Sequence, residues 1–158
     1  MKRIALLLAA AVLATATAST ARADGDPASD YLLVQRVFLS YELAPYPQQK
    51  AALAKAVAAA NRGGYKIRVA VISSAYDLGS VTSLWRKPQT YAKFLGVELS
   101  FVYRQRLLVV MPNGFGFNWV KHSAAPGYAV LAKLKVKAGG AGLLESATAA
   151  VEALAKAG

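Results

Sequence analysis

Apolar residues in this chain gather in short blocks that differ in periodicity. The block 31–41 (YLLVQRVFLSY) is rich in β-branched and aromatic residues, which predicts a strand. The blocks 65–72 and 107–111 are continuously apolar over most of their length, as in strands buried on both faces. Apolar and polar residues alternate over 128–137, which predicts a further strand with one solvated face at a sheet edge.

Segments with helical periodicity separate most of these strands. The spacing of apolar residues predicts helices near 48–61, 88–100 and 143–157, and Pro47 and Pro88 suit the first turns of the first two. The order strand, helix, strand, helix, strand requires crossover connections between parallel strands. We therefore expect one α/β domain, an α/β sandwich in which helices pack on a mainly parallel sheet.

Residues 1–23 have the pattern of a secretory signal peptide. A basic start at residues 2–3 precedes an apolar run at 4–13, and the ARA motif at 21–23 is a small-x-small cleavage site. Cleavage would leave a mature domain, 24–158, in an extracytoplasmic location, secreted or associated with the cell envelope. The alternative is an uncleaved anchor, although the run is short for a span of about 20 residues. We expect no transmembrane span in the mature chain.

Composition narrows the class of partner. The 158 residues include 19 Lys and Arg, 8 Asp and Glu, one His and no Cys, and 56% are apolar. A chain this apolar can bury a sizeable core, and it offers neither disulfides nor thiolate ligands. After removal of the signal, 16 basic residues remain against 8 acidic ones. This surplus favours an anionic lipid, an anionic wall polymer or an envelope or membrane-associated protein, whereas export disfavours nucleic acid.

Candidate ligand-binding residues follow from the predicted sheet. In open parallel sheets, ligands bind beyond the carboxyl ends of the strands. Both buried-type strands are followed there by polar or glycine-rich loops. The loops supply five candidate ligand-binding residues: Ser73, Ser74, Asn113, Gly114 and Gly116.

Asp77 is the one acidic residue in these two loops. A carboxylate beside amide and carbonyl oxygens suits Ca²⁺ or Mg²⁺, so a weak metal site shared with Asn113 is one interpretation. The other interpretation is that Asp77 caps the turn that follows it. The acidic segment 24–30 lacks the spacing of a calcium-binding loop and is expected to be a solvated N-terminal lead.

Three other features have less specific patterns. Lys133, Lys135 and Lys137 would share one face of the last predicted strand, where they could contact an anionic surface or protect the sheet edge. His122 has no motif that supplies partners for a catalytic triad. The motif at 114–117 (GFGF) lacks the third glycine of a nucleotide-binding loop and is interpreted as a tight aromatic turn.

Three motifs occur in a characteristic order within 31–118: Asp77-Leu78 after an apolar strand, YAKFLG at 91–96, and RLLVVM at 106–111. In this order the chain resembles the TPM domain of extracytoplasmic bacterial proteins and thylakoid photosystem II repair proteins. The resemblance implies an α/β sandwich, export, association with membrane or envelope machinery, and in some members divalent-cation binding or weak phosphatase activity. The family continues the LLVV strand into a charged hairpin strand, whereas the PNG sequence at 112–114 predicts a break here.

These observations favour a binding or assembly module of unknown ligand over an enzyme. Enzymes need placed acids, bases or nucleophiles, and no such set is recognisable. The alternative is a weak divalent-metal-assisted phosphatase, in which an ion near Asp77 polarises a phosphoryl oxygen. A third possibility is a protein held at the envelope surface by charge alone.

Overall fold

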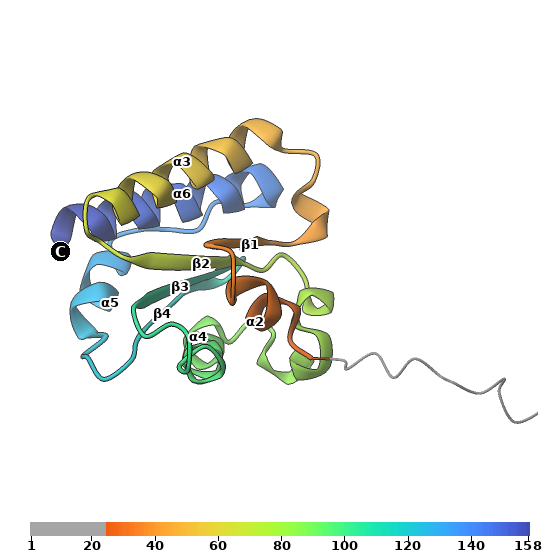
Figure 1. Cartoon of the computed structure of the whole chain (residues 1–158). Helices are drawn as coiled ribbons and strands as arrows, with labels where there is room; N and C mark the ends of the chain where they lie inside the picture. Colours follow the sequence, from red (N-terminus) through yellow and green to blue (C-terminus); the bar gives the residue numbers. More distant parts are fainter. Residues whose placement is uncertain (1–24) are drawn as a thin grey trace, which may run out of the picture.

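The computed structural model describes residues 25–158, so the predicted signal peptide lies outside the described residues. A four-stranded sheet forms the centre of the fold, and its spatial order matches the chain order (Figure 1). The first three strands are parallel, and the fourth is antiparallel to the third. The strands are β1 (Val37–Leu39), β2 (Ile67–Val71), β3 (Arg106–Met111) and β4 (Gly114–Trp119). This arrangement confirms the predicted α/β class with a mainly parallel sheet.

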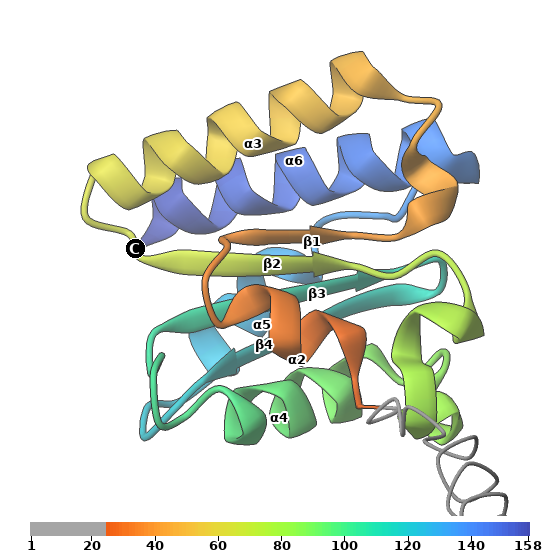
Figure 2. The ribbon, with the colours of Figure 1, turned by 45° about the vertical axis from the view of Figure 1, so that its right-hand side comes forward.

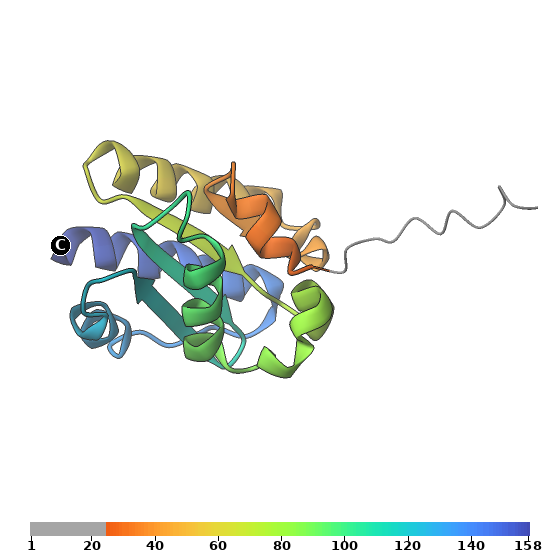
Figure 3. The same cartoon turned by 60° about the horizontal axis from the view of Figure 1, so that its bottom comes forward.

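Helices cover both faces of the sheet. Two long helices, α3 (Pro47–Arg62) and α6 (Gly139–Ala157), lie on one face (Figures 1 and 2). The other face carries the short helix α2 (Pro27–Leu32), the helix α4 (Pro88–Glu98) and the 3₁₀ segment η2 (Ala75–Leu84), which come forward in Figure 3. No helix within residues 25–158 combines the length and the apolar character that crossing a membrane requires.

The side chains of β3 are buried on both faces of the sheet. Leu108 and Val110 belong to the core under α3 and α6, whereas Leu107, Val109 and Met111 belong to the core under α2 and α4. All five side chains are at most 1% exposed. The continuously apolar pattern of this strand is therefore explained by helices on both sides, as the sequence predicts.

The hairpin of β3 and β4 corrects two predictions. Met111 pairs with Gly114, so Pro112 and Asn113 form a two-residue turn and the chain does not break away. The GFGF motif lies in β4 and is not a tight turn. At Gly116, a Cβ would lie 1.9 Å from the carbonyl oxygen of Pro88, so glycine permits the close approach of α4.

The prediction of a strand at 128–137 is wrong. Helix α5 (Ala125–Leu131) occupies its first part, and a turn at 132–133 and an irregular segment follow before α6. The Tyr128 hydroxyl accepts a hydrogen bond from the Phe117 N–H and donates to the Phe117 carbonyl, both at 3.0 Å. These contacts occupy the β4 edge, so a helix covers the position where another strand would have paired.

The N-terminal part also differs from the prediction. The strand predicted at 31–41 is reduced to β1, because α2 continues to Leu32. Asp26 caps α2 and is 4% exposed, so this part of the acidic segment is packed and not a solvated lead. The last predicted helix is present as α6 and begins at Gly139, four residues earlier than expected.

Candidate functional site

The carboxyl ends of β1 and β2 lie next to each other because these two strands are neighbours in the sheet. Ser40 follows β1, and Ser73 follows β2 after one further residue. The Ser73 Oγ lies 2.6 Å from Ser40 Oγ, 2.9 Å from Glu42 Oε2 and 3.5 Å from Asp77 Oδ2. We call these four residues, Ser40, Glu42, Ser73 and Asp77, the strand-end cluster.

Asp77 has mainly the capping role that the sequence left open. Its Oδ2 accepts hydrogen bonds from the backbone N–H of Ser73 at 2.8 Å and of Ser74 at 2.9 Å. These contacts are part of a capping box at the start of η2. The same oxygen also faces the Ser73 hydroxyl, so one carboxylate both closes its loop and borders the cluster.

Asn113 takes no part in the strand-end cluster. Its side-chain amide donates to the Arg86 carbonyl at 2.7 Å, in the exposed turn of the β3–β4 hairpin. Gly114 and Gly116 lie in β4, and the Gly116 backbone is covered by Pro88. The structure therefore does not join Asn113 to Asp77, because it is the β1 loop that contacts the β2 loop.

A cavity of about 300 Å³ adjoins the cluster. Ser73, Glu42 and Pro112 line it from the strand ends, while Lys137 and Gly139 line it from the start of α6. No side chain caps the first turn of α6, so its backbone amides give this wall a positive potential. The cavity thus has one wall of carboxylate and hydroxyl oxygens and another formed by the uncapped start of α6.

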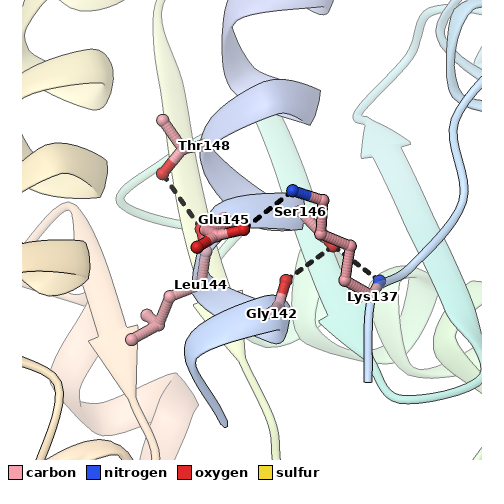
Figure 4. Close-up of polar contacts among 6 residues, drawn as sticks. All are labelled: Lys137, Gly142, Leu144, Glu145, Ser146 and Thr148. Atoms are coloured by element: carbon pink, nitrogen blue, oxygen red, sulfur yellow. Dashed lines mark hydrogen bonds and ion pairs between the residues drawn. The ribbon is translucent and has the colours of Figure 1, made fainter. Parts of the chain in front are cut away.

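Helix α6 holds Lys137 in place (Figure 4). The Lys137 Nζ forms an ion pair with Glu145 at 2.8 Å, and its backbone N–H donates to Ser146 Oγ at 2.9 Å. The Ser146 hydroxyl in turn donates to the Gly142 carbonyl at 2.7 Å. Lys133 and Lys135 are exposed on the irregular segment before α6, so the three lysines do not form a row on a strand.

Two tyrosines flank the cluster at the surface. Tyr41 adjoins Ser40, Tyr76 adjoins Asp77, and each tyrosine is 91% exposed. His122 lies elsewhere, in the turn after β4, where its ring stacks on Trp119 with 4.0 Å between centroids. Aromatic groups are therefore available beside the cluster, but the one imidazole is committed to a surface stack.

The donor set fits a weak cation site better than a tight one. Within residues 25–158, no group of three or more His, Cys, Asp or Glu side chains could hold a metal. The cluster offers two carboxylates, Glu42 and Asp77, with two hydroxyl oxygens between them. Calcium affinity falls with the number of charged ligands, so these residues would hold Ca²⁺ or Mg²⁺ only weakly.

Sequence reasoning missed Ser40 and Glu42. Both follow the first strand, so the rule that places sites at strand ends applies to them as well. The missing information was that β1 and not β3 supplies the contacting loop.

A scan against protein-family models finds no match for this chain, and searches of curated proteins and of solved structures find none either. The resemblance to the TPM domain therefore stays a prediction from the motifs within 31–118.

Proposed function

We propose that this protein is an exported, envelope-associated binding module that resembles TPM domains and takes its ligand at the strand-end cluster. One observation carries the proposal: oxygens from two loops converge around Ser73 beside a cavity of about 300 Å³. Export is inferred from the signal pattern of residues 1–23. The β3–β4 hairpin supports the resemblance, although β4 carries aromatic residues where the family has charged ones.

The chemistry of the cluster favours a divalent cation as part of what is bound. Glu42 is exposed, and its Oε2 contacts the Ser73 hydroxyl, so this carboxylate is accessible from the cavity. Hard cations bind carboxylate and hydroxyl oxygens, and weak sites of this kind are typical of extracellular modules. The uncapped backbone amides at the start of α6 suit an anionic group of the same ligand, whereas the charge of Lys137 is already paired with Glu145.

Thermal unfolding with and without Ca²⁺ or Mg²⁺ tests the cation part of the proposal. An ion at about ten times its dissociation constant stabilises the folded protein by about 1.4 kcal/mol, or about 3–5 °C in Tm. Glu42→Gln keeps the hydrogen bond to Ser73 and removes the charge, so we expect it to abolish the shift. Glu98→Gln removes an exposed charge at the end of α4 and should leave the shift intact.

Two results would contradict this assignment of the site. One is the absence of a thermal shift at any soluble ion concentration. The other is an equal shift in Glu42→Gln and Glu98→Gln, which would place the ion elsewhere.

A weak divalent-metal-assisted phosphatase is a second candidate, favoured by a single contact. The Ser73 hydroxyl donates to Glu42 Oε2 at 2.9 Å, which pairs a possible nucleophile with a proton acceptor. Hydrolysis of p-nitrophenyl phosphate, measured with and without added Mg²⁺, tests this function. Turnover that depends on the ion and is lost in Ser73→Ala would favour the phosphatase over the binding module.

A further inference from the structure

A second hollow lies at the opposite edge of the sheet, where the parallel strands begin. It has a volume of about 780 Å³ and lies between α3, the α2–β1 connection and the α4–β3 connection. Figure 2 shows both connections at the same edge of the sheet. We call it the amino-edge groove and define it by six of its lining residues: Val34, Arg36, Asn61, Lys66, Arg68 and Tyr103.

Three cationic side chains line this groove, and no acidic side chain does. In the part of the chain that the structure describes, the one ion pair within 4.0 Å joins Lys137 to Glu145. Neither residue lines this groove. Burial lowers the pKa of Arg68, Tyr103 opposes this effect, and the nearby charge of Arg36 adds to the lowering. Two arginines thus repel each other across the groove without a carboxylate to neutralise them, an arrangement that an anion would relieve.

Two of the three cations, Arg68 and Lys66, are held by contacts with neighbouring groups. The Arg68 guanidinium donates to the Leu32 carbonyl and stacks over the Tyr103 ring, 4.1 Å from its centroid. Arg68 therefore joins the two connections that border the groove. Lys66 Nζ donates to the Asn61 carbonyl at 2.8 Å, and this contact fixes the ammonium group at the end of α3.

Asn61 in turn organises the floor of the groove. Its side-chain amide donates to the carbonyls of Val57 at 2.8 Å and Ile67 at 2.9 Å. Because α3 and the start of β2 are tied through this side chain, the positions of Lys66 and Arg68 are set before any ligand arrives. Such preorganisation lowers the entropic cost of binding.

Exposed apolar side chains accompany the groove. Val34 is 79% exposed on its lining, and Phe101 and Val102, which precede Tyr103, are 73% and 54% exposed. Cations beside exposed aromatic and aliphatic residues are typical of surfaces that meet a lipid interface.

We propose that the amino-edge groove binds a phosphate group through Arg36, Lys66 and Arg68. A guanidinium presents paired N–H donors that match phosphate oxygens, and an ammonium adds a compact charge. The phosphate is carried either by a small soluble ester or by a phospholipid headgroup. This site shares no residue with the strand-end cluster, so each proposal can be tested independently of the other.

Titration with inorganic phosphate, followed by NMR amide shifts or calorimetry on the purified protein, measures the site directly. We expect shifts centred on the groove and an affinity about tenfold weaker in Arg36→Ala, as for loss of one charge-assisted hydrogen bond. The Arg36 side chain is exposed and has no hydrogen bond within residues 25–158, so folding should be retained. Lys133→Ala removes the same charge from another surface and should change the affinity less than about twofold.

Co-sedimentation with phosphatidylcholine vesicles, with and without phosphatidic acid, identifies the source of the phosphate. Binding only to vesicles with phosphatidic acid, weakened by Arg36→Ala and by Phe101→Ser, assigns a headgroup; Phe101→Ser should leave inorganic phosphate binding unchanged. Phosphate binding without vesicle binding assigns a soluble ester. The proposal is overturned if neither probe binds, or if Lys133→Ala weakens binding as much as Arg36→Ala.

Discussion

The hydrogen bond between Tyr91 and Asp26 joins α4 to the start of α2. The Tyr91 hydroxyl donates to Asp26 Oδ1 at 2.6 Å, and the two residues are 0% and 4% exposed. The other carboxylate oxygen, Oδ2, is buried without a hydrogen-bond partner among the described residues. Tyr91→Phe removes the hydroxyl alone and leaves the aromatic packing in place, so it isolates the contribution of this contact.

The loss of unfolding free energy expected for Tyr91→Phe depends on the charge of Asp26. Burial raises the pKa of the Asp26 carboxyl, while the hydrogen bonds from Tyr91 and from the Ala28 and Ser29 backbone lower it. A hydrogen bond to a charged group contributes about 1.5–3 kcal/mol, and one to a neutral group about 0.5–1.5 kcal/mol. We therefore expect Tyr91→Phe to reduce the free energy of unfolding by about 2–3 kcal/mol at about pH 8 and by about 1 kcal/mol at about pH 4.

The direction of the pH effect follows from linkage. The folded-state pKa of Asp26 lies above the ordinary value of 3.8, so the folded protein holds this proton more tightly than the unfolded chain does. The stability that protonated Asp26 contributes is present below the unfolded pKa and is lost as pH rises through the folded pKa. Without Tyr91 the folded pKa rises further, so the variant loses stability over a wider range of pH.

Urea unfolding at about pH 8 and about pH 4 measures the loss of unfolding free energy at each pH. Tyr103→Phe is the matched control. The Tyr103 hydroxyl donates to the Arg106 carbonyl at 3.0 Å, so its removal deletes a hydrogen bond to a neutral acceptor. We expect the same loss at both pH values for this control. An equal loss for Tyr91→Phe at the two pH values would refute the role of the Asp26 charge.

The parts of the fold that could be predicted are those fixed by local pattern. Strands β2 and β3 have apolar runs that only burial on both faces accommodates, and α3 and α4 begin at prolines that suit the first helical turn. These signals act within a few residues, so the sequence alone contains them.

The segment 128–137 shows where local pattern fails. Its alternating apolar residues do contact the core, but Tyr128 does so from α5, and Leu134 and Val136 do so from an irregular segment. Period-two alternation requires only that every second side chain points inward. In the structure the Tyr128 hydroxyl contacts the Phe117 backbone from α5, and this contact depends on the position of β4, which local pattern does not contain.

The candidate site depends on strand order, which no local signal supplies. The sequence predicts that the loops after β2 and β3 converge, because the carboxyl ends of parallel strands open on the same edge of the sheet. In the structure, β2 has two neighbours, and it is the β1 loop that brings Glu42 to Ser73. The choice between the two sides of β2 comes from long-range packing, so the residue types could be predicted but their pairing could not.

Three further substitutions test the contacts that hold these elements together. Gly116→Ala would place a Cβ 1.9 Å from the Pro88 carbonyl oxygen. We therefore expect calorimetry to show a loss of about 3 kcal/mol in the free energy of unfolding. A loss below about 1 kcal/mol would mean that α4 can move away from β4 at little cost. Asn61→Ala leaves the Ile67 carbonyl and N–H without their side-chain partner, and urea unfolding should show a loss of about 2 kcal/mol. Tyr128→Phe leaves both backbone groups of Phe117 without a partner on the β4 edge. Because α5 still covers that edge, water can satisfy the groups only when the helix lifts, so we expect a loss of about 1–2 kcal/mol together with faster hydrogen exchange at the Phe117 amide. Unchanged exchange at this amide would contradict the role of the Tyr128 hydroxyl in closing the sheet edge, whatever the loss of stability.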